Sequence, residues 1–230
     1  MRRRPSAPPA AAVAALALAL VLAGAAQASD WKPLFDGKSL KGWTMANGAP
    51  PAAGWRVEQG ALTVEGRPGD LFTVTTYRDF ELEFEWKVEA KTNSGVKYRL
   101  HRVPDGAWLG PEYQIWDEGA VGRPHLGATA SLYNMIAPAA EARSAEAGKW
   151  NRSRIVARGN HLEHWLNGVK SIEVEIGSDD WSQRLARSKF AQEEGSADWF
   201  ARRPGPIMLQ NHGGRVWYRK LRIREFEAGR

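Results

Sequence analysis

The stretch that most constrains this chain is DFELEFEWKVEA, residues 79–90, in which apolar and charged side chains alternate. Apolar residues occupy every second position from Phe80 to Val88, and glutamates and a lysine stand between them. Side chains of a β-strand point alternately to the two faces of its sheet. The stretch therefore predicts a strand with one apolar face and one charged face, and a sheet that buries one side.

Other short stretches have the same β character and are separated by turn residues. Residues 178–190 predict a single helix with Ser178 as its N-cap. The fold class is therefore an all-β, two-sheet antiparallel sandwich with one short helix. The expected β segments are two short strands within 31–44, a hairpin over 54–66 around Gln59-Gly60, a strand at 94–100 that pairs with 80–88, a three-stranded meander over 150–176 with a turn at Asn167-Gly168, and two strands around Gly213-Gly214 within 205–227.

The first 28 residues have the composition of a secretory signal peptide. Three arginines precede an uncharged apolar run, residues 10–26, and Ala26-Gln27-Ala28 is a small-x-small cleavage site. A membrane anchor is the alternative. Cleavage after Ala28 leaves residues 29–230 as a single domain without stable insertion in a membrane, and indicates a periplasmic or secreted protein.

Charge and cysteine content narrow the possible partners. The chain carries a net charge of +6, and loss of the three leader arginines lowers this to about +3. No basic run remains, which argues against nucleic acid as a partner. The chain has no cysteine, so an exported domain of this kind is held together by its core alone. Any exposed members of its 11 tryptophans would suit stacking on sugar rings.

Seven stretches between about Trp31 and Phe226 form an ordered set: LFDGKSLKGW, YRDFELEFEWK, NSGVKYRL, EYQIWD, EHWLNG, SKF and GPIMLQNHGGRVWYRKLRI. Together they resemble the 3-keto-disaccharide hydrolase family. The resemblance implies a concanavalin-like jelly roll, usually exported, that cleaves glycosides whose sugar has been oxidised at C3. The expected partner is then a small-molecule carbohydrate substrate.

The stretch EYQIWD places polar groups on a strand that also carries aromatic residues. Glu112, Gln114 and Trp116 share one face of a regular strand. We expect Glu112 to be a base or metal ligand, Gln114 a donor to the sugar and Trp116 a stacking platform; a plain solvated face is the alternative. Asp117 would lie about 17 Å from Glu112 and on the opposite face, too far for the paired carboxylates of an ordinary glycosidase.

The remaining candidates lie in loops and neighbouring strands. His125, in a Gly- and Pro-rich loop, is an acid, a metal ligand or an ordinary surface histidine. The family resemblance makes His212 the third catalytic candidate, with a plain turn residue as the alternative. Arg99 is expected to reach the groove and hold an anionic intermediate, with plain surface charge as the alternative. The other substrate-binding candidates are Asn93, Ser94, Tyr133 and Gln210, together with Glu85 and Lys87, which match family positions although their charged row also suits a solvated sheet face.

A ketone at C3 changes what such an enzyme needs. It acidifies the proton on C2, so one base can remove that proton and the group on C1 then leaves by β-elimination, before water adds back. The sequence requires no cofactor. A divalent cation on Glu112, His125 and His212 would polarise the C3 carbonyl, but no strong ligand spacing is present. A non-catalytic carbohydrate-binding module of the same fold is the main alternative, and an ordinary glucanase is the third hypothesis; the oligomeric state is open.

Overall fold

The alternating stretch forms β6 (Phe80–Val88), a central strand of an eight-stranded antiparallel sheet in this computed structural model. The apolar residues of β6 are buried in the core, and Glu83, Glu85 and Lys87 are partly exposed on its other face. The predicted one-sided burial of this strand is therefore confirmed.

The structure describes residues 31–120, 125–193 and 195–227. The predicted signal peptide, residues 1–28, lies outside this described part. No helix within it is both long and apolar enough to cross a lipid bilayer.

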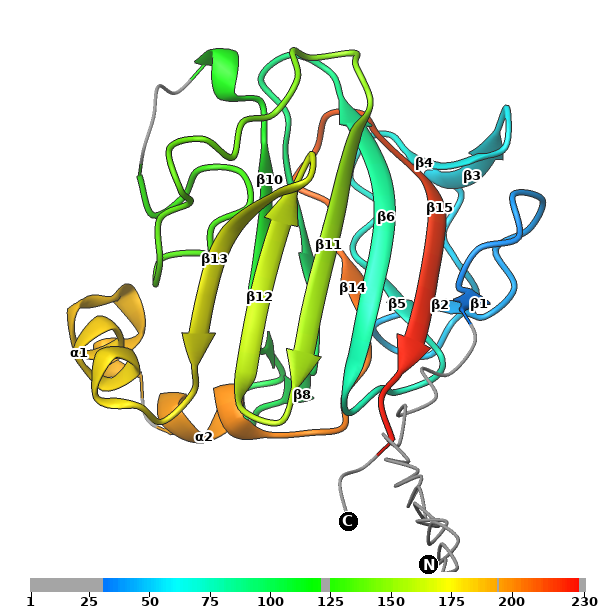
Figure 1. Cartoon of the computed structure of the whole chain (residues 1–230). Coiled ribbons are helices and arrows are strands. Elements are labelled where there is room, and N and C mark those ends of the chain that lie inside the picture. Colours follow the sequence, from blue (N-terminus) through cyan, green and yellow to red (C-terminus); the bar gives the residue numbers. More distant parts are fainter. Residues whose placement is uncertain (1–30, 121–124, 194, 228–230) are drawn as a thin grey trace, which may run out of the picture.

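The eight-stranded sheet has the order β13-β12-β11-β6-β15-β4-β3, and β1 pairs with β15 (Figure 1). The meander is confirmed as β11, β12 and β13, and Asn167 (φ 50°) and Gly168 (φ 87°) make its second turn, where both residues need positive φ. The other strands of this sheet, with the meander, are β1 (Lys32–Pro33), β3 (Trp55–Glu58), β4 (Ala61–Val64), β11 (Asn151–Arg158), β12 (His161–Leu166), β13 (Val169–Glu175) and β15 (Val216–Glu225).

A five-stranded antiparallel sheet lies behind the first one, in the order β10-β7-β14-β5-β2 (Figure 1). Its strands are β2 (Trp43–Met45), β5 (Leu71–Thr73), β7 (Asn93–Lys97), β10 (Glu112–Trp116) and β14 (Met208–Leu209). A two-stranded ribbon, β8 (His101–Arg102) and β9 (Trp108–Leu109), stands apart from both sheets.

The core fills the space between the two sheets. Phe84 of β6 meets Tyr113 of β10 edge to face, with ring centroids 5.6 Å apart. Ser153 of β11 links the same strands, because its Oγ accepts from the Trp86 indole at 2.8 Å and lies 2.7 Å from the Tyr113 hydroxyl. The predicted two-sheet antiparallel sandwich is confirmed.

One predicted pairing is wrong. The stretch at 94–100 was expected beside 80–88, but β7 pairs with β10 and β14 in the other sheet. The two edges of β6 are instead taken by β11 and β15. Lys91 has a positive φ of 62° in the turn after β6, and the chain crosses there from one sheet to the other.

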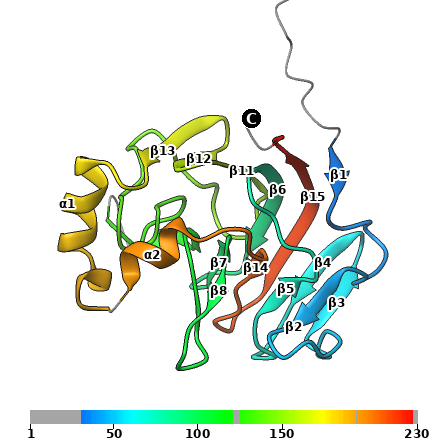
Figure 2. The same ribbon diagram turned by 90° about the horizontal axis from the view of Figure 1, so that it is seen from below.

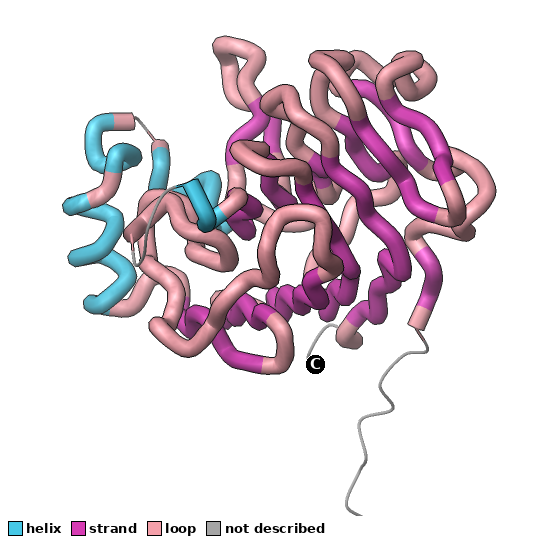
Figure 3. The backbone as a smooth tube through the Cα atoms, turned by 90° about the horizontal axis from the view of Figure 1, so that it is seen from above, coloured by secondary structure: helices cyan, strands magenta, loops and turns pink. Residues whose placement is uncertain are grey.

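The helical part is larger than predicted. Helix α1 (Asp179–Arg187) has the predicted N-cap, since Ser178 Oγ accepts from the Trp181 backbone N–H at 3.1 Å. A 3-10 turn, η2 (Lys189–Gln192), and a second helix, α2 (Ser196–Ala201), follow it. Figures 2 and 3 show these helices gathered at one end of the sandwich. Residues 178–201, apart from position 194, are called the helical cover below.

Candidate functional site

The candidate site is the outer face of the five-stranded sheet, on β7 and β10. Tyr113 and Ile115 are buried in the core, so the intervening residues of β10 face away from it. The register places Glu112 opposite Lys97, Gln114 opposite Gly95 and Trp116 opposite Asn93. The shared face expected for Glu112, Gln114 and Trp116 is therefore present.

Glu112 lines a hollow of about 160 Å³, the Glu112 hollow, and is only 7% exposed. The Nζ atom of Lys97 lies 3.5 Å from its Oε2 atom. Burial raises the pKa of Glu112, and the positive charges of Lys97, Lys189 and His212 offset part of that rise. A carboxylate with a raised pKa is a stronger base than an ordinary glutamate.

The helical cover supplies one wall of the Glu112 hollow. Lys189 and Glu193 are exposed at this wall, and Phe190, Trp199 and Phe200 complete it. Tyr133, a predicted site residue, also lines the hollow, with Lys189 Nζ 4.2 Å from its ring centroid. Three residues that line the hollow were not predicted from the sequence: Lys97, Lys189 and Glu193. Only Lys97 could have been found there, because it shares a strand face with the predicted site residue Asn93.

Gly95 makes room for the polar groups on this face. A Cβ atom there would stand 2.7 Å from Glu112 Oε1 and 3.3 Å from Gln210 Oε1. Gln210 is 7% exposed, and its Oε1 atom has no hydrogen-bond partner among the described residues. Glu112 and Gln210 therefore lie on either side of Gly95 on the floor of the site, and any larger residue at position 95 would push them apart.

The other end of the face carries Asn93, Gln114 and Trp116. Gln114 is buried, and its Nε2 group donates to Asn93 Oδ1 at 2.9 Å. Trp116 is partly exposed and meets His125 edge to face, with centroids 6.4 Å apart. His125 Nδ1 also accepts from the Gly127 backbone N–H at 3.0 Å. This part of the site suits binding better than proton transfer.

His212 and Asn93 line a second hollow, of about 420 Å³. We call it the Arg67 hollow, since Arg67 also lines it, with Lys91 and Gly213. His212 is close enough to Glu112 for its charge to influence the pKa of that carboxyl. The structure thus brings Glu112 and His212 to neighbouring hollows and not to one.

Ser94 and Arg99 do not face the site. Ser94 points into the core, where its Oγ donates to the Gln210 carbonyl oxygen at 2.7 Å and lies 2.8 Å from the Tyr218 hydroxyl. Arg99 has a positive φ of 51°, which breaks the strand alternation on which its prediction relied. Its buried guanidinium bonds to Asp79 at 2.8 Å and to the carbonyl oxygens of Arg78 and Gly159.

Glu85 and Lys87 lie on the outer face of the other sheet, with the core between them and Glu112. Glu85 accepts from Arg219 and Lys220, each at 2.7 Å. Lys87 Nζ stands 4.5 Å from the Trp217 ring centroid. The placement agrees with the alternative of a charged, solvated sheet face.

Asp117 caps local backbone and is not paired with Glu112 as a second glycosidase carboxylate. Its Oδ2 accepts from the Lys91 N–H at 2.7 Å, and its Oδ1 accepts from the Gly119 N–H at 3.2 Å. Both oxygens are therefore engaged at the end of β10, which agrees with the argument from strand spacing.

The residues at the site do not fit the divalent cation considered from the sequence. Within the described part of the chain, Glu112, His125 and His212 do not offer three ligand atoms within 4.8 Å of one another. Lys97 and Lys189 already bring positive charge to Glu112. We therefore assign no metal ion to the candidate site.

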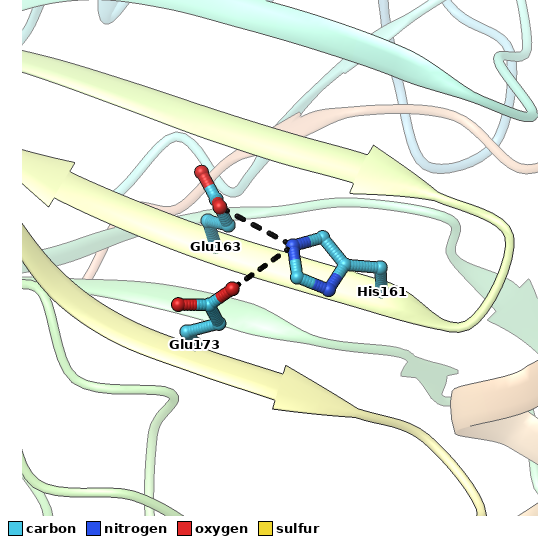
Figure 4. Close-up of side chains that lie close together, drawn as sticks. All are labelled: His161, Glu163 and Glu173. Atoms are coloured by element: carbon cyan, nitrogen blue, oxygen red, sulfur yellow. Dashed lines mark hydrogen bonds and ion pairs between the residues drawn. The ribbon is translucent and has the colours of Figure 1, made fainter.

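A group of metal-ligand type lies on the outer face of the eight-stranded sheet. His161, Glu163 and Glu173 point toward one another from β12 and β13 (Figure 4). Lys170 Nζ sits between the two carboxylates, 2.9 Å from Glu163 and 2.7 Å from Glu173, and offsets part of their negative charge. His164, three residues after His161, is fully buried, so the two histidines point to opposite faces of the strand.

Comparison with known proteins agrees with this architecture. The family model for the 3-keto-alpha-glucoside-1,2-lyase-like domain matches residues 30–224. The chain belongs to this family. It is 28% identical to a protein of Bacteroides thetaiotaomicron named 3-keto-disaccharide hydrolase, over 86% of this chain and 79% of the relative.

Solved structures of similar sequence share the sandwich of this family member. A crystal structure from Parabacteroides distasonis, of a protein provisionally named a glycosyl hydrolase, is 30% identical with a TM-score of 0.74, over 86% of this chain and 94% of the other. A second such structure from the same organism is 26% identical with a TM-score of 0.66, over 85% and 99% of the two chains. The family and the jelly-roll fold expected from the sequence are both confirmed, and the protein is of a carbohydrate-active, hydrolase-type family.

Proposed function

We propose that the protein cleaves 3-keto-glycosides, in particular 3-keto-disaccharides, at the Glu112 hollow. The observation that carries the proposal is a buried carboxylate with a raised pKa, facing two lysines in a hollow on a sheet face. The name of the Bacteroides thetaiotaomicron relative, 3-keto-disaccharide hydrolase, supports the choice of substrate.

In the proposed reaction Glu112 takes the C2 proton of the keto sugar. The C2–H electron pair forms a C2=C3 bond and leaves negative charge on the C3 oxygen, which Lys97 and Lys189 would stabilise. The charge then returns to re-form the C3 ketone, a C1=C2 bond forms, and the C1–O bond breaks. The departing oxygen takes a proton. Hydrolysis is completed when water adds its hydroxyl to C1 and its proton to C2.

This route asks for one base and a cationic pocket, and the hollow supplies both. Among the residues that line the hollow, Tyr133, Lys97 and Lys189 carry groups that can give up a proton. A tyrosine hydroxyl or a lysine ammonium group can protonate a leaving oxygen. The histidine candidates lie further along the face, so we assign His125 and His212 to binding and not to the proton transfer.

The direct test is to incubate the purified protein with 3-keto-trehalose and measure glucose release. Glu112→Gln should lower the rate by about 10²- to 10⁴-fold, the usual contribution of a general base. Glu83→Gln is the matched control, because Glu83 is a carboxylate of the opposite outer face and should leave the rate unchanged. Equal rates for wild type and Glu112→Gln would exclude Glu112 as the base.

A non-catalytic carbohydrate-binding module is the second candidate function, since Trp116 is partly exposed beside Gln114 and Asn93. Such a module would bind the keto sugar without glucose release, and Glu112→Gln would keep nearly full affinity. An ordinary glucanase, the third hypothesis, would instead cleave unoxidised trehalose or glucan. The same assay with unoxidised sugar therefore distinguishes a glucanase from the other two candidates.

The place of action is proposed as the periplasm or the cell exterior. The proposal rests on the leader, residues 1–28, with its arginines, its apolar run and its small-residue cleavage site. Mass spectrometry of the protein recovered from the periplasm or medium should show a mature N-terminus at Ser29. Recovery of the intact leader from the cytoplasm would contradict it.

A further inference from the structure

The Glu112 hollow is too small for a whole disaccharide. Its volume of about 160 Å³ lies below the roughly 300 Å³ at which sites for larger ligands begin. The helical cover closes one wall of it. A keto sugar ring placed over Glu112 therefore needs a second space for the unit attached at C1.

The Arg67 hollow lies at the Asn93 end of β7, the strand whose other end carries Lys97. Lys97 lines the Glu112 hollow and Asn93 lines the Arg67 hollow, and both residues point outward from β7. The two residues are four positions apart on the strand, which is about 13 Å. This separation suits two linked pyranose rings, one at each end. Gly95 stands between them and adds no side chain to the floor.

Several hydrogen-bond donors of the Arg67 hollow have no protein partner among the described residues. Within the described residues, Arg67 and Lys91 form no side-chain hydrogen bond or ion pair, and the Nδ2 group of Asn93 has no partner because Gln114 engages only its Oδ1. On the opposite outer face, by contrast, Arg152, Arg154 and Arg222 each bind a glutamate. The unpaired donors of the hollow are available to a ligand.

The wall of the Arg67 hollow allows a ligand to come close to the backbone. Gly213 and Gly214 both adopt positive φ, 84° and 80°, and expose their backbone there. The guanidinium of Arg67 lies 3.3–3.5 Å from the position of a Cβ on Gly213. Glu89 lines the same hollow and offers acceptors. Sugar hydroxyls both donate and accept, so this mixture of groups suits a second sugar unit.

We propose that the Arg67 hollow is the subsite for the leaving-group sugar of the substrate, with Arg67 and Asn93 as its hydrogen-bond donors. This inference rests on the proposed function, since it requires the keto ring over Glu112. A third hollow, lined by Leu109, Trp199 and Arg202, shares residues with the other side of the Glu112 hollow and is the competing location.

The test compares a 3-keto-disaccharide, 3-keto-trehalose, with methyl 3-keto-α-glucoside, which has no second sugar. Arg67→Ala should lower kcat/KM about tenfold for the disaccharide, the order expected for a hydrogen bond from a charged group, and leave the methyl glycoside unchanged. Arg67 is exposed and unpaired among the described residues, so the variant should fold normally. Arg202→Ala is the matched control and should change neither substrate.

Each result separates the two proposals. Wild-type cleavage of both substrates, with Arg67→Ala selectively impaired on the disaccharide, supports the subsite. If Arg67→Ala affects neither substrate, or both equally, the subsite is refuted while the proposed function stands. A selective loss of disaccharide cleavage in Arg202→Ala would instead place the second sugar in the third hollow. That result would also refute the subsite in the Arg67 hollow. Failure of the wild type to cleave either substrate refutes the function and the subsite together.

Discussion

His164 is fully buried between the sheets, and its two ring nitrogens have different partners. Nε2 lies 2.9 Å from the Tyr98 hydroxyl, and Nδ1 lies 3.2 Å from the Ser131 carbonyl oxygen. A neutral ring satisfies both, with Nδ1–H donating to the carbonyl and Nε2 accepting from Tyr98. Burial lowers the pKa of His164 to about 3.

This histidine should make the protein sensitive to acid. Its pKa is lower in the folded protein than in the unfolded chain, so between about pH 6.5 and pH 3 only the unfolded chain binds the proton. The free energy of unfolding should therefore be fully retained above about pH 6.5 and fall below it, by up to about 1.4 kcal/mol per pH unit. Denaturant unfolding across this range, for wild type and His164→Gln, should give the variant the shallower slope. Parallel slopes would contradict the assignment.

Glu112 should set the acid limb of the activity. Only its ionised form accepts a proton, and burial raises its pKa above the usual 4.5, so kcat/KM should rise with pH through a midpoint above that value. Lys97→Met removes a charge that holds this pKa down, so the midpoint should move to higher pH. Lys87→Met, on the other outer face, is the control. A midpoint that stays in place in Lys97→Met would show that another group titrates.

Single residues were predictable where strand alternation held and not where it broke. Glu112, Gln114 and Trp116 share the expected face because β10 is regular. The prediction for Arg99 was wrong because its positive φ turns the side chain into the protein. The sequence around Arg99 does not indicate that this residue has a positive φ. Lys189 was missed for a different reason, since its approach to Glu112 depends on the tertiary packing of the helical cover.

At the scale of elements, the turn η2 carries a residue that we assign to the chemistry. Lys189 lies next to Ser188, which ends α1 and also caps η2 through a bond from the Phe190 N–H. Phe190 packs against Trp199 and Phe200 edge to face, at 5.7 and 5.5 Å. This aromatic contact holds η2 over the sheet, so Lys189 is positioned by packing.

Lys189→Met should lower kcat about tenfold to a hundredfold, because a charge aimed at a developing oxyanion acts mainly in the transition state. Arg187→Met is the control, since Arg187 is an exposed cation of α1 whose side chain bonds only to Gln183 in the described part of the chain. Steady-state kinetics on 3-keto-trehalose would measure both. Equal losses in the two variants would indicate a general effect of charge and remove Lys189 from the mechanism.

Elements with a hydrophobic pattern that extends over many residues were predicted, and short elements were not. Nine residues of alternation defined β6, and Asn167-Gly168 defined a hairpin of the meander. Helix α2 has six residues, too few to show a helical period. The partner of β7 was mistaken because pairing between strands is set by the whole topology, which neighbouring strands in the sequence reveal only in part.

At the scale of the whole molecule, carboxylates on the two outer faces have pKa shifts in opposite directions. Three glutamates of β6 each bind two cations: Glu81 binds Arg154 and Arg224, Glu83 binds Arg152 and Arg222, and Glu85 binds Arg219 and Lys220. Burial alone would raise the pKa of Glu83, but its hydrogen bonds with Arg222 and Arg152 lower it overall. Glu112, on the other face, has the raised pKa. Opposite shifts of this kind separate structural from reactive carboxylates.

The contrast predicts opposite stability effects for one chemical change. The folded state gains from ionised Glu83 above its unfolded pKa and loses that gain as the pH falls, so Glu83→Gln should cost about 1–2 kcal/mol near neutral pH and little in acid. Ionised Glu112 is penalised in the folded state once the pH exceeds its unfolded pKa, so Glu112→Gln should not destabilise the protein there. Thermal unfolding and glucose release, measured on both variants, should show stability lost in one and activity lost in the other. If Glu112→Gln lost both stability and activity, the carboxylate would be a group that stabilises the fold and not a base with a raised pKa.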